Sequence, residues 1–373
     1  MTTSKPLPSK LPHALTLPPK WLSLYSNFIQ THQSSVTQIE SALRSLTYII
    51  PGRFRDAELA SESLHSSIQL LSMYHDTLLT RALSKLPGMP GQQSPHNRYT
   101  KFWIAKSKFY RRVATVLAIV QYTELLWEMM AKRKGERTRW RVIILLEVIK
   151  ATCRLLLLKI TNARPLVTPA LPEREVIPDE ETNSPPPEDE EAALEAELEG
   201  RSPSPSQQNY KMKRTGLSLP TLPNPGDISS YLLSKVLTAD DIKSPSTLLN
   251  TMPRTALLAE TVHILQPLVY AIALSRSKSK SNWQPWLLSL SLEYAARQLR
   301  KDRDSLQTTA LEREQWNKRG WAMGWLAMRG AFYENVTKGF LHSTSERLPG
   351  LISGVLDDYL YLWDGYYFST SSN

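Results

Sequence analysis

The most apolar part of the chain, residues 142–160, contains twelve Val, Ile and Leu residues. If this segment is a helix, its polar positions Glu147, Lys150 and Arg154 fall three and four residues apart. That spacing places all three on one narrow stripe and leaves the rest of the circumference apolar. The pattern therefore predicts a helix that is buried, either in protein or in lipid.

A comparison of transfer free energies separates the possible membrane placements. Three charged side chains at the centre of a bilayer cost about 8–10 kcal/mol, and twelve Val, Ile and Leu residues return about 4–7 kcal/mol. Spanning is therefore unfavourable for this helix alone, unless the charged stripe meets a partner helix or water. We expect the helix to lie in the membrane interface, with the stripe toward water. A core helix of a soluble helical protein fits the same pattern.

Apolar periodicity predicts helices along most of the remaining chain. The expected helices cover residues 35–50, 56–86, 99–131, 255–275, 286–300 and 308–348. Ser35 and Gln38 form a possible capping box at the start of the first. Segment 255–275 is a second membrane candidate, although it lacks the run of about 18 apolar residues that marks a confident span.

Two glutamates near the end of segment 99–131 need an interpretation. Glu124, Glu128 and Lys132 follow one another at intervals of four residues, so Glu128 can pair with Lys132 on a helix. Two carboxylates could also bind a metal ion, but no His stands at ligand spacing. We interpret the glutamates as part of a solvated face.

Composition changes along the chain indicate its division into parts. Residues 1–20 are rich in proline and are expected to be a disordered tail, followed by a helical half over 21–163. Residues 164–227 are expected to be a disordered linker with acidic and Pro/Ser stretches, and 228–373 a second helical half. The fold class expected is all-α, a membrane-associated helical bundle with a long linker between its halves. A proline-directed kinase could modify SPSPS in the linker, at 202–206.

Charge points to an anionic partner. The net charge is +10, and residues 173–199 contain twelve acidic residues and one basic residue, so the rest of the chain carries about +21. Nucleic-acid binding requires basic and aromatic residues interleaved on one exposed face, whereas the basic residues here flank apolar helices. The arrangement favours membrane lipids over nucleic acid. Cys153 is the only cysteine, which excludes a disulfide framework within the chain.

The densest basic cluster precedes the apolar helix, and we expect it to target the chain to membranes. Each basic residue near an anionic surface contributes about 1 kcal/mol. The targeting residues proposed are Lys132, Arg133, Lys134, Arg137 and Arg139, and Arg141 follows them.

Motifs of catalysis are hard to find. The chain has no glycine-rich phosphate loop, no H-E-x-x-H zinc motif and no nucleophile elbow. His75 and Asp76 are adjacent, but neighbours on a helix point about 100° apart. We expect no enzyme activity, cofactor, metal or small-molecule substrate. Asn335 begins the one N-x-S/T sequon, and we expect it to be unmodified and cytosolic.

Four segments together resemble the peroxin-16 family of peroxisomal membrane biogenesis proteins. They are LRSLTYIIPGRFRDAELASE, YTELLWEMMAKRKGERTRWRVIILLEVIKA, NWQPWL and DYLYLWDGYYF, and they occur in the family's order. The best-matching positions are Gly52, Arg53, Phe54, Glu124, Glu128, Arg139, Trp140, Trp283, Pro285 and Trp286. The chain departs from the family's frequent Ser-Trp-Lys-Pro-Trp, with Asn282 and Gln284 at the two variable places.

The resemblance implies a non-enzymatic protein of the peroxisomal membrane, routed partly through the endoplasmic reticulum. It implies a role in recruiting and inserting other peroxisomal membrane proteins, with peroxin-3 and peroxin-19 as partners. The alternative from the residues alone is a soluble helical scaffold that binds protein partners through its aromatic surfaces.

Overall fold

The computed structural model describes most of the chain outside the tail and the acidic segment. The described residues are 24–25, 28–29, 33–49, 58–83, 94–174, 243–277, 279, 281–301, 309–347 and 349–371. All regular structure within these ranges is helical, which confirms the expected all-α class. Positions Gly52, Arg53 and Phe54 lie outside the described residues.

The longer helices follow the predicted segments, with shifted ends and additional breaks. In chain order they are α2 (Gln33–Ile49), α3 (Glu58–Leu83), α4 (Pro95–Lys106), α5 (Lys108–Lys134), α6 (Glu136–Ile160), α10 (Arg254–Arg276), α11 (Trp283–Lys301), α12 (Ala310–Gly324), α13 (Gly330–Phe332), α14 (Lys338–Ser345) and α15 (Gly350–Gly365). A short π-helical stretch, Tyr333–Thr337, joins α13 to α14.

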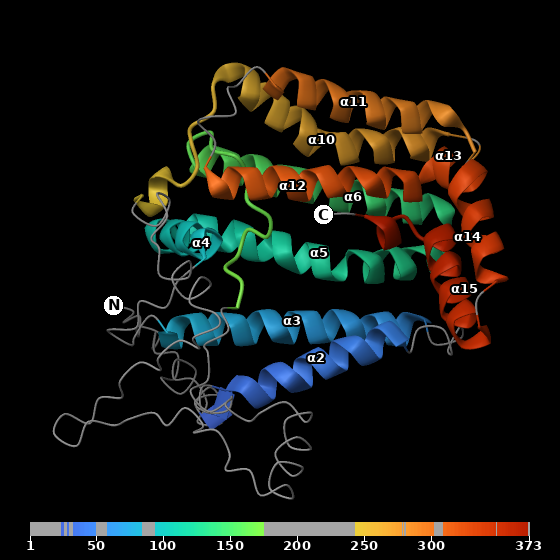
Figure 1. Ribbon diagram of the computed structural model, residues 1–373, viewed down its shortest axis with the longest axis horizontal. Coiled ribbons are helices and arrows are strands. Elements are labelled where there is room, and N and C mark those ends of the chain that lie inside the picture. The colour runs from blue at the N-terminus through green and yellow to red at the C-terminus, as the bar shows by residue number, and fades with distance from the viewer. Residues whose placement is uncertain are drawn as a thin grey trace, which may run out of the picture. The chain divides into compact units, whose positions relative to one another are not determined.

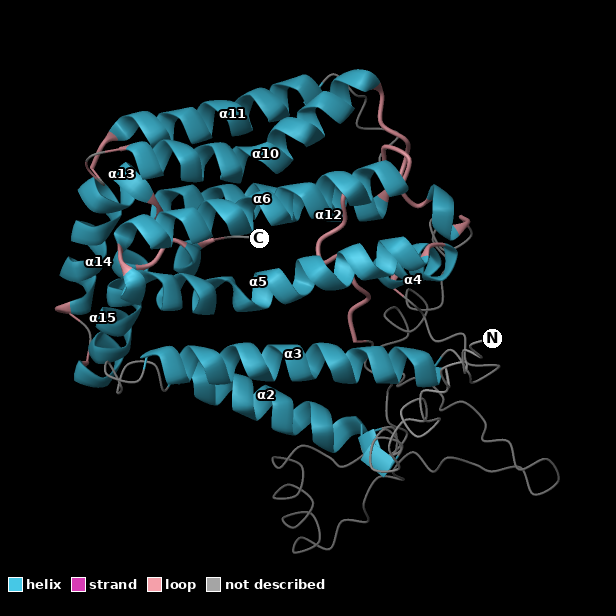
Figure 2. Cartoon of the chain, turned by 180° about the vertical axis from the view of Figure 1, so that it is seen from behind, coloured by secondary structure: helices cyan, strands magenta, loops and turns pink. Residues whose placement is uncertain are grey.

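The long helices form a stack in which each contacts the next (Figure 1). The order of contacts is α2, α3, α5, α6, α10 and α11, so helices from both sides of the acidic segment pack together. Helices α13, α14 and α15 lie across one end of the stack, as Figure 2 shows from behind. The two predicted helical halves therefore share one packed unit.

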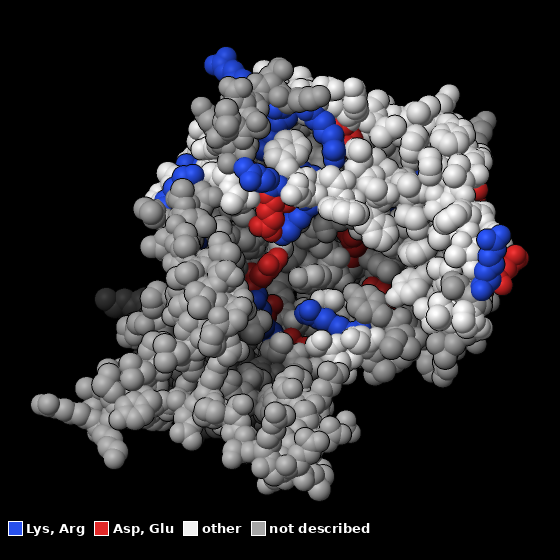
Figure 3. Space-filling view, in the orientation of Figure 1, with Lys and Arg blue, Asp and Glu red and all other residues white. Residues whose placement is uncertain are grey.

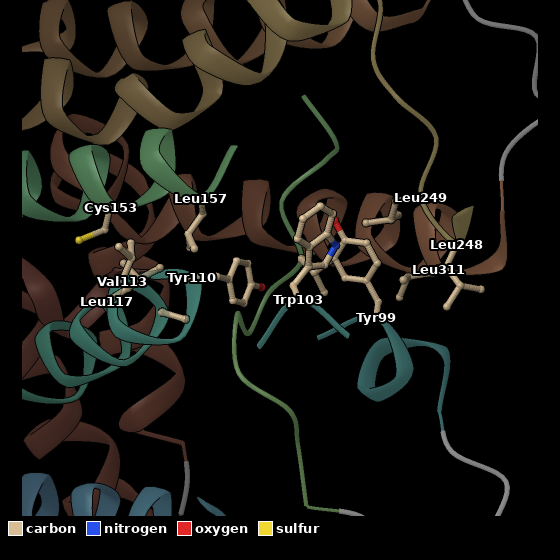
Figure 4. Packing of buried hydrophobic residues seen from close by; sticks show 12 residues of the cluster. Tyr99, Trp103, Tyr110, Val113, Leu117, Cys153, Leu157, Leu248, Leu249 and Leu311 are labelled. Carbon is tan, nitrogen blue, oxygen red and sulfur yellow. The ribbon is translucent and has the colours of Figure 1, made fainter. Parts of the chain in front are cut away.

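The largest core cluster joins α4, α5 and α6 to segments on either side of the acidic stretch (Figure 4). Tyr99, Trp103 and Tyr110 supply its aromatic centre, where neighbouring rings lie 6.2 and 6.4 Å apart between centroids. Cys153 is buried in the same cluster, so its side chain serves packing, as expected for an apolar helix.

The predicted linker begins too early at residue 164. Val167 is buried in the core cluster, and Glu173 N–H donates to Asn97 Oδ1 over 2.8 Å. Met252 N–H donates to Ala163 O over 2.8 Å, so the segments before and after the acidic stretch also contact each other. Composition did not predict that residues 164–174 are ordered, because the segment has few apolar residues. Those few form tertiary contacts. Residues 175–242 lie outside the described residues, so the rest of the linker stays a prediction.

Two predicted helices are interrupted. Segment 99–131 is split at Ser107, whose hydroxyl accepts from Tyr110 N–H over 3.2 Å and caps the start of α5. Segment 308–348 is broken at Gly330, which has φ 57°. A Cβ atom there would lie 2.5 Å from the hydroxyl oxygen of Tyr270, so only glycine fits this position.

Helical spacing predicts that the apolar faces of the first two helices consist of Val36, Ile39, Leu43, Leu46 and Ile50, and of Leu64, Ile68, Leu71 and Leu78. Val36 and Ile68 are buried, whereas Ile39 and Leu43 are exposed, so these predicted faces are wrong in part. Helix α2 already begins at Gln33, so Ser35 lies inside it and cannot be its N-cap. Leu64 and Leu71 of α3 are exposed, whereas Ser72 and His75 are buried. The buried polar groups bond one another, since His75 Nδ1 and the Ser72 hydroxyl both contact the Glu40 carboxylate of α2. Periodicity of apolar residues cannot show that a polar network forms the contact.

Candidate functional site

The basic cluster lies at a tight turn between two antiparallel helices. Helix α5 ends at Lys134 and α6 begins at Glu136, so Gly135 alone joins them. Its φ of 125° is a conformation that side chains with a Cβ rarely adopt. The exposed basic residues at this turn are Arg133, Lys134 and Arg137.

A buried carboxylate beside this turn binds the C-terminal segment. Glu128 is fully buried, and its Oε1 accepts from Arg139 Nε and Nη2 over 2.9 and 2.8 Å. The same carboxylate accepts from the backbone N–H groups of Tyr367 and Phe368, over 2.7 and 2.9 Å. Arg139 also donates to Gly365 O over 2.9 Å. We call Glu128, Arg139 and segment 365–368 the C-terminal clasp.

The charged stripe of α6 forms a second buried network. Lys150 Nζ lies 2.8 Å from Glu124 Oε2 on α5 and 2.9 Å from Glu147 Oε1. The Lys150 ammonium also lies 4.7 Å from the centre of the Phe368 ring, which joins this network to the clasp. A buried ammonium between two carboxylates satisfies the requirement that buried charges be paired.

These contacts correct three interpretations. Glu124 and Glu128 are buried, so the solvated-face interpretation is wrong, and Glu128 pairs with Arg139 where a pair with Lys132 was expected. The stripe of α6 faces a partner helix, so its expected orientation toward water is wrong for Glu147 and Lys150. Sequence spacing shows that these residues share a face, but it does not identify the helix that this face contacts.

The five proposed targeting residues therefore divide into two groups. Lys132 and Arg139 contact the C-terminal segment: Lys132 Nζ donates to Gly365 O over 3.2 Å and lies 4.2 Å from the Tyr366 ring centre. Arg133, Lys134 and Arg137 are exposed, as is Arg141. The exposed group is free to meet an anionic surface, while the contacting group stabilises the clasp.

A cavity of about 300 Å³ opens beside the clasp. Its lining includes Lys132, Arg139, Trp140, Arg329 and Tyr333, together with the acidic side chains of Glu136, Glu334 and Asp364. Burial, followed by the charges of Asp364 and Glu334, raises the pKa of Tyr333 to about 12. The Tyr333 hydroxyl is therefore a neutral hydrogen-bond donor at physiological pH, and the cavity wall carries both signs of charge.

The aromatic positions of the family resemblance lie in two places. Trp140 packs edge-on to Tyr367 of the clasp, with ring centroids 6.3 Å apart. Trp286 on α11 stacks on Phe332 at 5.4 Å and donates from Nε1 to Leu326 O over 2.9 Å. Pro285 is buried, and Trp283 packs edge-on against Trp286. These residues join α11 to the chain that follows α12.

A third ionic network was not anticipated from the sequence. Glu260 of α10 is buried, and Arg319 of α12 binds both its oxygens, over 2.6 and 2.7 Å. Arg300 of α11 donates to Glu260 Oε2 over 3.2 Å. The sequence did contain one indication of this network, because Glu260 is the lone acidic residue of an apolar segment. A carboxylate in a buried helix requires a cationic partner.

The sequon lies on the surface near the start of α11. Asn335 is exposed within the π-helical stretch, and its Nδ2 donates to Ala331 O over 2.7 Å. Its Oδ1 accepts from the Ser281 hydroxyl over 2.8 Å. The absence of a glycan at this residue stays a prediction.

Two described helices are long and apolar enough to cross a membrane. They are Lys108–Lys134 and Arg254–Arg276, which are α5 and α10. The second is the candidate expected at 255–275. Helix α6 does not pass this test, although the sequence pattern drew attention to it first, since its apolar runs are interrupted by the paired charges described above.

Comparisons with known proteins show which family the sequence matches. The chain is similar to the peroxisomal membrane protein PEX16 of Schizosaccharomyces pombe, with 21% identity over 82% of this chain and 84% of that protein. It is also similar to peroxisome biogenesis factor 16 of Dictyostelium discoideum, with 31% identity over 34% of this chain and 33% of that protein. No solved structure matches the chain. The family described as "Peroxisomal membrane protein (Pex16)" matches residues 23–365, nearly the whole length, and the chain therefore belongs to this family of peroxisomal membrane proteins.

Proposed function

We propose that this protein acts at the peroxisomal membrane as a non-enzymatic biogenesis factor that helps to recruit and insert other membrane proteins. The observation that carries the proposal is the family match over residues 23–365, which includes Glu128, Arg139 and the ionic network of Lys150 and ends at Gly365. The route to the membrane is proposed to pass partly through the endoplasmic reticulum. By family resemblance, the partners are the docking protein peroxin-3 and the cargo chaperone peroxin-19.

Attachment to the membrane is proposed to begin at the turn between α5 and α6. Arg133, Lys134 and Arg137 are exposed there, and each contributes about 1 kcal/mol near an anionic surface. Two apolar helices, α5 and α10, supply the longer stretches that anchoring requires. A pair of signals of this kind is what stable membrane attachment needs.

Recruitment is proposed to use exposed aromatic side chains of α12, of the turn that follows it and of α14. Trp321 is 85% exposed and Phe340 is 70% exposed, and Trp325 is also exposed. Large aromatic side chains in such numbers on a surface are typical of protein-binding sites, where tryptophan contributes much of the binding free energy. We call Trp321, Trp325 and Phe340 the aromatic surface.

A relocation experiment tests the proposal. The full chain is attached to the mitochondrial outer membrane in cells that lack the native protein, and a fluorescent peroxisomal membrane protein is then expressed. The proposal predicts that the reporter collects on mitochondria. It also predicts that changing Trp321 and Phe340 to Ala abolishes the effect, whereas Leu71→Ala, which removes an exposed apolar side chain of α3, preserves it.

Two results would contradict the proposal. A reporter distribution that does not respond to the position of the chain would refute recruitment. Recruitment that survives loss of the aromatic surface would refute that surface as the binding site and leave the recruiting role standing.

The second candidate function is that of a soluble scaffold for protein partners. The same aromatic surface favours it, because a scaffold also binds through exposed tryptophans. It differs from the first candidate in membrane attachment, which extraction of the protein from membranes measures directly.

A further inference from the structure

The outward face of α11 carries no charge in the part that the structure describes. The exposed fractions are 40% for Trp283, 52% for Leu287, 41% for Leu288 and 62% for Tyr294. The other exposed positions between 283 and 300 are Gln, Ser, Ala or Leu. In Figure 3 the surface over most of α11 is correspondingly free of charged side chains. A helix on the outside of a soluble protein normally shows the opposite pattern, with its charges toward solvent.

Glu293 and Arg300 of α11 turn inward, and Arg297, whose side chain is 29% exposed, is paired with Glu293. Glu293 accepts from Arg297 Nε over 3.2 Å, and its other oxygen lies 2.8 Å from His263 Nδ1 on α10. Arg297 also donates to Arg319 O over 3.0 Å. Every one of these polar groups is therefore paired within the protein.

Arg300, near the end of α11, is held in the same way. Its guanidinium donates to Glu260 and lies 4.1 Å from the centre of the Trp316 ring. Its side chain is 12% exposed, and Glu260 is 1% exposed. The three charged residues between 283 and 300 are thus all paired within the protein.

Helix α10, which packs against α11, has the same arrangement and suitable length. Leu258 and Leu265 are exposed, while its one acidic residue, Glu260, is buried. Arg254 and Arg276 are exposed at its two ends. A helix of 23 residues is about 34 Å long, close to the roughly 30 Å of the hydrocarbon core of a bilayer. The two arginines are therefore spaced to reach the anionic headgroups of both leaflets.

We propose that the outward faces of α10 and α11 contact the acyl chains of the bilayer, so that this helical hairpin is embedded in lipid. Polar groups in a membrane must be paired within the protein, and the inward networks of α11 meet this condition. Helix α11 is not among the helices apolar enough to span a membrane, because its sequence contains glutamines and serines as well as charged residues. The inference rests on the membrane attachment in the proposed function and adds which surface makes it.

Site-specific labelling tests whether the outward face of α11 contacts lipid. The full chain is reconstituted into vesicles of phosphatidylcholine with a minor fraction of anionic phospholipid. Single cysteines replace Leu288 on α11 or, as a control, Arg137 at the exposed turn, and each carries an environment-sensitive nitrobenzoxadiazole dye. The native Cys153 is buried, and the unchanged chain measures any background labelling.

Lipid contact predicts that the dye in Leu288→Cys is strongly quenched by doxyl-labelled lipids. Quenching by aqueous iodide should be several-fold weaker there than in Arg137→Cys. A dye at Leu288 that is open to iodide would overturn the inference. A dye shielded from both quenchers, together with disulfide cross-links between unlabelled Leu288→Cys copies treated with a mild oxidant, would also overturn it and assign the face to a second copy of the chain.

The vesicle experiment also separates this inference from the proposed function. Flotation of the unlabelled chain with the vesicles measures attachment alone. If the chain floats while the Leu288→Cys dye remains in water, membrane attachment stands and the α10–α11 face is excluded as the contact. If the chain does not float, attachment itself fails.

Discussion

Removing the charge of Glu128 is expected to release the C-terminal segment. Glu128→Gln keeps the size of the side chain but removes the buried carboxylate that pairs with Arg139, which then keeps only its contact with the exposed Glu136. Breaking a buried ion pair by neutralising one partner costs about 3–5 kcal/mol, because the other charge stays buried and unpaired. The backbone N–H groups of Tyr367 and Phe368 lose a charged acceptor in addition.

Glu136→Gln is a matched control in the same neighbourhood. Its Oε2 lies 3.3 Å from Arg139 Nη1, but its side chain is 64% exposed. An exposed pair of this kind contributes about 1 kcal/mol or less. The two substitutions remove the same charge from the same arginine and differ in burial.

Thermal unfolding of the purified full chain in detergent measures the difference. We expect the melting temperature to fall by about 10 °C in Glu128→Gln, and by no more than about 3 °C in Glu136→Gln. Brief chymotrypsin treatment should cleave near Tyr366–Phe368 much faster in Glu128→Gln, since the segment no longer has its anchor. Equal losses in the two variants, with unchanged cleavage, would refute the clasp as a stabilising contact.

Three further predictions concern the turn, α3 and the acidic segment. Changing the exposed residues Arg133, Lys134 and Arg137 to Ser should release a fluorescent fusion into the cytosol without lowering the melting temperature; unchanged localisation in cells lacking the native protein would exclude them as the targeting element. Burial raises the pKa of Glu62 from 4.5 to about 7, so its ionisation destabilises the fold increasingly between these two pH values and fully above pH 7. Glu62→Gln should therefore stabilise the protein by about 2–3 kcal/mol at pH 8 and hardly at pH 4, and an equal effect at both pH values would disprove this ionisation as the cause. Deleting residues 175–215 should change neither melting temperature nor membrane association, because the acidic and Pro/Ser sequence has no apolar face to contribute to a core; loss of either would show that the acidic segment contributes contacts.

Helix positions could be predicted from the sequence, whereas partners between helices could not. Segment 255–275 became α10 almost unchanged, because its apolar run and flanking polar residues mark both ends. The burial of Glu128 was missed because its partners, Arg139 and segment 365–368, lie 11 and about 240 residues away. Spacing within one helix contains no information on such contacts.

The same reason explains the missed surface of α11. Residues 283–300 of α11 contain three charges in an amphipathic pattern, and only the tertiary contacts of Glu293, Arg297 and Arg300 show that these charges are paired within the protein. Conversely, the basic cluster was recognised from composition alone, but the division into exposed residues and residues that hold the clasp required the position of Gly365. The local sequence thus predicted the helices and the positions of their charged residues. Tertiary packing determines which of these residues are exposed and which are paired within the protein.

Sodium carbonate extraction tests most directly whether the chain is a membrane-anchored biogenesis factor or a soluble scaffold. Alkaline carbonate removes proteins that are held on a membrane surface by charge, and it leaves those whose apolar helices contact lipid. We predict that the full chain, expressed in cells lacking the native protein, remains with the peroxisomal membrane pellet. Its complete recovery in the supernatant, together with a soluble peroxisomal marker, would contradict membrane anchoring.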